Sequence, residues 1–139
     1  MRKIEKDVMT DSVRLEEIRK VVERLKVLSA DHIILIEGLK DREALTALGI
    51  SGDMFQIQSE GGPMKAVEYV EANGGKAVIL TDWDRRGGLL ASQLRTIFGP
   101  DNPDIDYLVR EDLAKLGRHY VKDVEAMDSL VARLSESNI

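Results

Sequence analysis

The sequence predicts an α/β protein built on a mostly parallel sheet. Two short runs of β-branched and other apolar residues, 33–36 and 77–81, have the composition of strands that are buried on both faces. Apolar residues with one-sided helical spacing lie before, between and after these runs. Strands that alternate with helices imply right-handed β-α-β crossovers, and therefore parallel strands with helices on both faces of the sheet.

The first element is a predicted helix over residues 12–28. Apolar residues recur along one side of it, and Ser12 is its expected N-cap. The apolar residues of this helix are Val13, Ile18, Val21, Val22, Leu25 and Leu28. Residues 1–11, which precede it, are polar and are expected to be loosely ordered.

The rest of the chain divides at its glycines and prolines into further strands and helices. Strands are expected at 33–36, 55–58, 76–81 and 105–109. Helices are expected at 40–48, 63–72, 87–98, 111–116 and 124–134. Gly49 ends the helix at 40–48, and Pro63 suits the first turn of the next one. The residues expected to be buried in helix 87–98 are Leu90, Leu94, Ile97 and Phe98.

Length and composition bound the functions that the chain can have. Its 139 residues predict one domain, residues 1–139, with an N-terminal helical segment at 12–30 and a core at 31–134. The chain has no cysteine, which excludes disulfides, thiolate metal sites and a cysteine nucleophile. A net charge of −5 argues against nonspecific coating of nucleic acid. The same net charge is compatible with local binding of a few phosphates, or with phosphate contacts made through a metal ion.

The expected location is the cytoplasm, without a membrane partner. The first residues lack the apolar stretch of a signal peptide. No apolar run approaches the roughly 18 residues that cross a bilayer.

Two acidic clusters are the most informative feature of the chain. Glu37 follows the run 33–36, and Asp82 and Asp84 follow the run 77–81. Ligands of open α/β sheets bind just beyond the carboxyl ends of the strands, so these three carboxylates are expected to meet there. Carboxylates that meet repel each other and raise each other's pKa, and a bound divalent cation relieves that repulsion. Hard oxygen ligands of this kind suit Mg²⁺.

Each of these acids also has a structural interpretation. Glu37 is an acid in a strand–helix loop, which is common, although Gly38 beside it would let a ligand approach closely. Asp41 lies where a helix begins, and the helix dipole favours acids there. Asp82 and Asp84 face the same side if strand geometry continues through them, and otherwise either one can cap a helix. Two acids in one turn favour metal binding over capping.

The basic residues around these clusters are candidates for phosphate contacts. Arg85 and Arg86 precede a helix whose free N–H groups can hold a phosphate, or they simply offset the charge of the neighbouring acids. Gly38 and Asp41 are further candidates for phosphate contacts. The stretch 110–122 is the most basic one, and it is expected to be solvated helical surface. Neither GxxxxGK[ST] nor GxGxxG occurs, so P-loop and dinucleotide binding have no support.

The two acidic motifs together resemble the Toprim domain. Its pattern is an apolar strand ending in Glu-Gly, then an apolar strand ending in Asp-x-Asp with a glycine soon after. Here IILIEGLKD is followed about 45 residues later by VILTDWDRRGG. The resemblance covers residues 31 to about 100. It is closest to small stand-alone Toprim proteins and to the ribonuclease that matures 5S ribosomal RNA, and the domain also occurs in primases and topoisomerases.

This resemblance implies both a fold and a site. The fold would be a Toprim-type three-layer sandwich, with about four mostly parallel strands, helices on both faces and an additional N-terminal helix. Asp82 and Asp84 would hold one or two Mg²⁺ ions, and Glu37 would contact metal and act in acid/base chemistry. The chain has no room for the tyrosine-bearing domain of a topoisomerase or the priming regions of a primase.

The expected function is therefore Mg²⁺-dependent phosphoryl transfer on RNA or DNA by a small Toprim nuclease. The alternative is a noncatalytic module that binds Mg²⁺ or a nucleotide and docks onto a protein partner in a larger nucleic-acid-processing complex. A phosphatase or receiver-like fold that uses Asp82 ranks third. Phosphatases of the haloacid-dehalogenase type carry Asp-x-Asp after the first strand with Thr or Val two residues later, where this chain has Arg86.

Overall fold

The fold is the predicted α/β sandwich with a four-stranded parallel sheet at its centre. The computed structural model describes residues 10–117 and 123–137, so most of the segment 1–11 lies outside the described residues. The strands run parallel in the order β2-β1-β3-β4. Their bounds are β1 (Ile33–Ile36), β2 (Met54–Gln56), β3 (Ala77–Ile79) and β4 (Ile105–Asp106).

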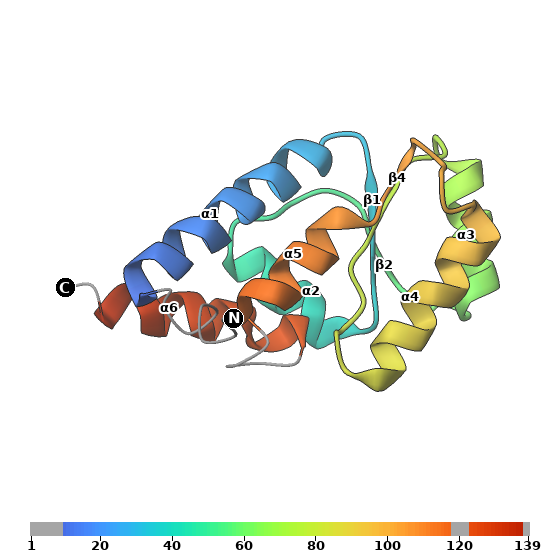
Figure 1. Cartoon of the computed structure of the whole chain (residues 1–139). Coiled ribbons are helices and arrows are strands. Elements are labelled where there is room, and N and C mark those ends of the chain that lie inside the picture. Colours follow the sequence, from blue (N-terminus) through green and yellow to red (C-terminus); the bar gives the residue numbers. More distant parts are fainter. Residues whose placement is uncertain (1–9, 118–122, 138–139) are drawn as a thin grey trace, which may run out of the picture.

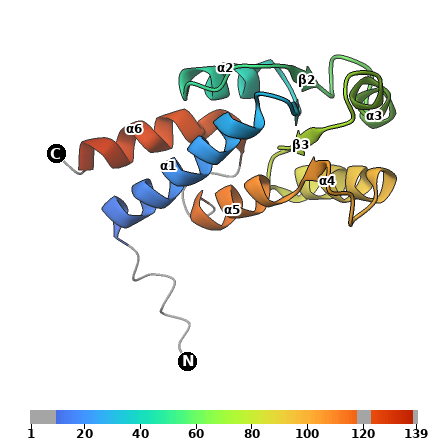
Figure 2. The same ribbon diagram turned by 90° about the horizontal axis from the view of Figure 1, so that it is seen from above.

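Helices cover both faces of the sheet, as Figure 1 shows. The helices are α1 (Asp11–Leu28), α2 (Leu39–Ala47), α3 (Pro63–Ala72), α4 (Arg85–Phe98), α5 (Leu108–Gly117) and α6 (Met127–Ser137). A short 3₁₀ helix, η2 (Val124–Ala126), leads into α6. α3 and α4 pack on one face, and α1, α2, α5 and α6 form the layer on the other. In that second layer α1 packs against both α5 and α6 (Figure 2).

The alternation of side chains along β1 explains why both faces need cover. Ile33 and Leu35 point into the core shared with α3 and α4, whereas Ile34 and Ile36 point into the core shared with the other four helices. All four are almost completely buried. A strand with apolar residues on both sides is stable only between two layers, which is what its continuous apolar run predicts.

The start of α1 differs from the prediction. Thr10 is the N-cap, with its hydroxyl accepting a hydrogen bond from the N–H of Val13 at 3.2 Å, so the assignment to Ser12 was wrong. Val13 is 46% exposed, and Leu15 is buried instead. At about 100° of rotation per residue, Val13 and Leu15 lie on opposite sides of the helix, and only Leu15 shares a side with Ile18.

Other element boundaries shift for identifiable reasons. β4 is shorter than predicted because the Asp106 carboxylate accepts a hydrogen bond from the N–H of Val109 at 2.9 Å, in the first turn of α5. Ile97, predicted to be buried in α4, is 37% exposed. The final helix takes the 3₁₀ form over its first three residues before continuing as α6. The helix at 63–72 has the predicted bounds.

Within the described part of the chain, no helix has both the length and the apolar character needed to span a bilayer.

The strand order creates a crevice between the two central strands. After β1 the chain passes through α2 to β2 on one side, and after β3 it passes through α4 to β4 on the other. The loops that follow β1 and β3 therefore diverge from each other at the carboxyl edge of the sheet. Such a switch point is where open α/β sheets bind their ligands.

Candidate functional site

The crevice between the ends of β1 and β3 contains an acidic cavity of about 360 Å³. We call it the acidic cavity. Four carboxylates line it, together with two cationic side chains, Lys40 and Arg86. The carboxylates are those of Glu37, Asp41, Asp82 and Glu125. They come from the loop after β1 with the first turn of α2, from the loop after β3 and from η2, so three separate parts of the sequence supply the carboxylates.

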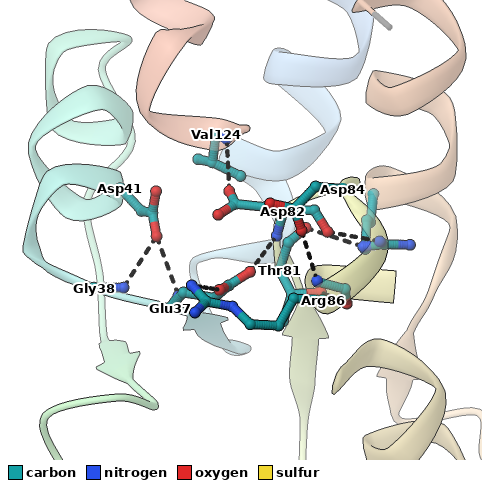
Figure 3. Close-up of polar contacts among 10 residues, drawn as sticks. Glu37, Gly38, Asp41, Thr81, Asp82, Asp84, Arg86 and Val124 are labelled. Carbon is teal, nitrogen blue, oxygen red and sulfur yellow. Dashed lines mark hydrogen bonds and ion pairs between the residues drawn. The ribbon is translucent and has the colours of Figure 1, made fainter. Parts of the chain in front are cut away.

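Glu37 ties the two central strands together. Its side chain is buried, and its Oε2 atom accepts a hydrogen bond from the backbone N–H of Asp82 at 2.8 Å (Figure 3). Its other oxygen, Oε1, lies 3.8 Å from the guanidinium Nη2 of Arg86, a side chain that is 77% exposed. Because Arg86 is so exposed, that ion pair contributes little, and the buried hydrogen bond to the Asp82 backbone fixes the position of Glu37.

Asp41 has the structural role that its position at a helix start suggests. Its Oδ2 atom accepts hydrogen bonds from the backbone N–H groups of Gly38 at 3.0 Å and Glu37 at 3.2 Å. These bonds satisfy donors at the start of α2 that have no partner within the helix. The carboxyl group is also buried against the acidic cavity, and this burial raises its pKa.

Asp82 is the most strongly perturbed carboxyl group of the site. Its Oδ1 atom accepts a hydrogen bond from the backbone N–H of Val124 at 2.9 Å, which connects the loop after β3 to η2. Burial is the main reason that its pKa rises from an ordinary value near 3.8 to about 7. The negative charges of Asp41, Glu37 and Asp123 raise it further, and the Val124 hydrogen bond opposes them. This carboxylate is destabilised in its ionised form.

Asp84 is not among the residues that line the acidic cavity. β3 ends at Ile79, so strand geometry does not continue to Asp84, and the condition for placing it on the same side as Asp82 is not met. Asp84 is the N-cap of α4, and its Oδ1 atom accepts a hydrogen bond from the N–H of Gly87 at 2.7 Å. Its Oδ2 atom makes no hydrogen bond with the described residues. Glu37 and Asp82 are thus brought together, and Asp84 is held by the helix that follows.

Two contacts hold the loop after β3 rigidly. Arg110 of α5 donates hydrogen bonds to the carbonyl oxygens of Thr81 at 2.9 Å and Asp82 at 2.7 Å. A Cβ atom on Gly87 would overlap the same carbonyl oxygen of Asp82 and its carbonyl carbon. Arg110 is therefore half-buried and bonded to the site, rather than solvated surface as predicted. Residues 118–122 of that basic stretch lie outside the described residues.

Of the residues Arg85, Arg86 and Gly38, which were predicted to contact phosphate, only some line the acidic cavity. Arg85 and Arg86 are the first two residues of α4 and are exposed, and only Arg86 lines the acidic cavity. Gly38 lines it as well, but its backbone is extended, and a Cβ atom there would be 3.5 Å from the side chain of Gln58. A side chain at position 38 would therefore fit, whereas one at position 87 would collide with the Asp82 backbone.

The donor set suits a hard divalent cation held partly by water. Among residues 10–117 and 123–137, no group of three or more His, Asp or Glu side chains is arranged to hold one ion. Mg²⁺ commonly keeps several waters and takes one or two carboxylates together with substrate phosphate oxygens. Glu37 and Asp82 provide two carboxylates of this kind, and the repulsion around Asp82 is what a cation would relieve.

Three contributors to the site were not predicted from the sequence. Glu125 adds a fourth carboxylate, the Val124 backbone orients Asp82, and Arg110 holds the loop. No local pattern marks any of them, because each reaches the site through the packing of α5 and η2 against the sheet.

Comparison with known proteins gives sequence relatives in archaea. No protein-family model matches the chain. A UPF0292 protein of Methanosarcina barkeri is 34% identical over 122 residues, which cover 87% of this chain and 85% of that protein. UPF0292 proteins of Methanosarcina acetivorans and Methanocaldococcus jannaschii are 32% and 28% identical. A solved protein from Aquifex aeolicus has a TM-score of 0.63 at 21% identity, covering 77% of this chain and 94% of its own, and so shares the fold.

The close approach of α4 to the Asp82 loop gives a stability prediction. Gly87→Ala should destabilise the protein by about 1–3 kcal/mol, because the added methyl group meets backbone that cannot rotate away. Gly88→Ala is the matched control, since the nearest atom to its Cβ would be a side-chain nitrogen of Arg110 at 3.8 Å. A helical Gly-to-Ala change without strain is expected to be neutral or slightly stabilising. Urea unfolding measures both, and equal stabilities would contradict this account of the contact.

The raised pKa of Asp82 predicts how stability depends on pH in metal-free buffer. The folded protein binds this proton more tightly than the unfolded chain does, so the contribution is fully present below about pH 4 and is lost as the pH rises to about 7. Asp82→Asn should therefore be more stable than the wild type at pH 8, by roughly 1–2 kcal/mol after allowing for solvent screening of a half-buried group.

At pH 3 the Asp82→Asn variant and the wild type should be nearly equal, since the carboxyl group is then protonated in both the folded and unfolded states. The Asn carbonyl oxygen still accepts the Val124 hydrogen bond, so the comparison isolates the charge. Denaturant unfolding in EDTA across this pH range is the measurement. A variant that is less stable at pH 8 would show that the Asp82 charge supports the fold instead of straining it.

Proposed function

The chain belongs to the UPF0292 family, and we propose that it is a Mg²⁺-dependent enzyme of phosphoryl transfer on nucleic acid, a small Toprim-type nuclease. The observation that carries this proposal is the pairing of Glu37 and Asp82 in one acidic cavity at the switch point of the sheet. These are the first acids of the two motifs that resemble the Toprim pattern.

The cavity has the charge distribution that a metal-assisted phosphate site requires. Four carboxylates attract a cation, and they would repel a phosphodiester if no cation were bound. Glu37 and Asp82 would hold Mg²⁺, and Asp84 is the third ligand that the resemblance implies. When bound, the ion would neutralise charge on the phosphate and lower the pKa of a water molecule. Lys40 and Arg86 line the same cavity and would balance the remaining phosphate charge.

Glu37 is the residue that we assign to proton transfer. One of its oxygens is fixed by the Asp82 N–H, and the other faces the cavity near the exposed guanidinium of Arg86. A carboxylate held in one orientation by a buried hydrogen bond can take a proton from the attacking oxygen or give one to the leaving oxygen without first reorganising. Asp82 and its loop then keep this orientation through the same hydrogen bond.

The noncatalytic docking module remains the second candidate. The net charge of −5 favours it, because an acidic protein gains little affinity from phosphate contacts alone. This candidate predicts a protein that binds Mg²⁺ in the same cavity but does not cleave nucleic acid.

Glu37→Gln should abolish metal-dependent cleavage, with a loss of at least about 100-fold, because the proton carrier is removed. The assay uses structured RNA, single-stranded DNA and duplex DNA with Mg²⁺, Mn²⁺ or EDTA. Glu71→Gln makes the same chemical change on the exposed surface of α3, and it should retain full activity.

The outcomes of this assay separate the two candidates. Cleavage that survives in Glu37→Gln would remove Glu37 from the chemistry. Absence of cleavage by the wild type, with Mg²⁺ binding still measurable by calorimetry and lost in Asp82→Asn, would replace the nuclease with the docking module.

A further inference from the structure

A second hollow adjoins the acidic cavity on the side of α3 and α4. It has a volume of about 420 Å³ and lies between the loop after β2, the start of α3 and the first turns of α4. We call it the α3–α4 groove. Glu37, Gln58 and Arg86 line both the groove and the acidic cavity, so the two hollows are immediate neighbours. The other residues that line the groove are Ile57, Gly62, Pro63, Leu89, Leu90 and Gln93.

The groove combines apolar walls with two amide side chains. Leu89 is 63% exposed, although it lies on a helix next to the proposed site. Gln58 and Gln93 are exposed, and their carboxamides make no hydrogen bond with another described residue. The charged residues among those lining the groove are Glu37 and Arg86, both at the border with the acidic cavity. Apart from that border, the groove therefore offers apolar surface and amide donors and acceptors.

We propose that the α3–α4 groove binds the base of the nucleotide beside the reacting phosphate, so that the substrate is single-stranded nucleic acid. This inference rests on the proposed function, because it places that phosphate in the acidic cavity. A nucleobase has flat apolar faces and an edge of hydrogen-bond donors and acceptors, which match Leu89 and Pro63 on the walls and the two carboxamides. In a duplex these faces are stacked and the edges are paired, so a paired base does not enter.

The charge of the chain supports base contacts over backbone contacts. With a net charge of −5, the protein cannot rely on neutralising many phosphates. Binding that depends on one base and one metal-held phosphate releases few counter-ions. Its affinity should therefore fall only slightly between about 50 and 200 mM salt, whereas a protein with six to ten phosphate contacts loses roughly 10³-fold or more.

The test is fluorescence anisotropy with the full chain and Ca²⁺, which oxygen ligands also hold, in place of Mg²⁺. The probes are labelled mixed-sequence single strands of DNA and of RNA, the same strands with abasic sites at alternate positions, and the matching duplexes. The intact single strand should bind at least about ten-fold more tightly than the duplex, and the abasic strand should lose most of that advantage. Equal binding of all three forms would overturn the proposal.

A matched pair of variants tests the groove itself. Leu89→Ala combined with Gln93→Ala should weaken single-strand binding at least about five-fold without changing duplex binding. Leu108→Ala removes a side chain that is 60% exposed on α5, outside the groove, and should have no effect. Both variants alter exposed residues, so circular dichroism should show unchanged folding. An unchanged affinity of the double variant would place the base elsewhere and overturn the inference.

The failure of this inference can be told apart from the failure of the proposed function. If the protein cleaves nucleic acid, but cleaves duplex equally well and ignores the double variant, the nuclease stands and the groove assignment falls. If the protein cleaves no nucleic acid, but binds single strands with an affinity that the double variant reduces, the groove assignment stands and the catalytic role falls.

Discussion

The hydrogen bond from the Asp82 backbone N–H to the buried Glu37 carboxylate is the contact on which the site depends. β1 and β3 are adjacent, but the chain leaves them in opposite directions, so nothing in the covalent connection holds their following loops together. The Glu37 side chain bridges that gap at 2.8 Å. A buried carboxylate without such a donor would cost far more, so the same bond that positions Glu37 also makes its burial tolerable.

The residues around that hydrogen bond hold the Asp82 carboxyl group close to other acids, at a cost in folding stability. The Asp82 carboxylate accepts a hydrogen bond from the backbone N–H of Val124, and the Asp82 carbonyl oxygen accepts one from Arg110. The same loop packs so closely on Gly87 that a Cβ atom at position 87 would not fit. Burial of the Asp82 carboxyl group is the main cause of its raised pKa, and the neighbouring acids, from which the rigid loop cannot move it away, raise the pKa further. Strongly perturbed pKa values of this kind cluster at sites that bind or transform a ligand.

The sequence predicts the parallel sheet and the meeting of Glu37 with Asp82, because both follow from short-range patterns and a general rule of α/β sheets. Continuous apolar runs identify buried strands, and Pro63 marks the start of α3. The N-cap role of Asp84 could not be told from a metal-ligand role in the sequence, since a ligand pair and a helix cap have the same local sequence. Glu125 and Arg110 join the site only through tertiary packing, which leaves no trace in their neighbours along the chain.

The central claim is that a divalent cation binds in the acidic cavity, and paramagnetic broadening by Mn²⁺ in amide NMR spectra tests it most directly. At a small fraction of one equivalent, Mn²⁺ should broaden the amide signals of Gly38, Thr81 and Asp82 first. The signals of Gly74 and Gly75, which precede β3 at the opposite edge of the sheet, should stay sharp. Broadening that spares Gly38 and Asp82, or that spreads evenly over the acidic surface, would contradict the assignment of a metal site to Glu37 and Asp82.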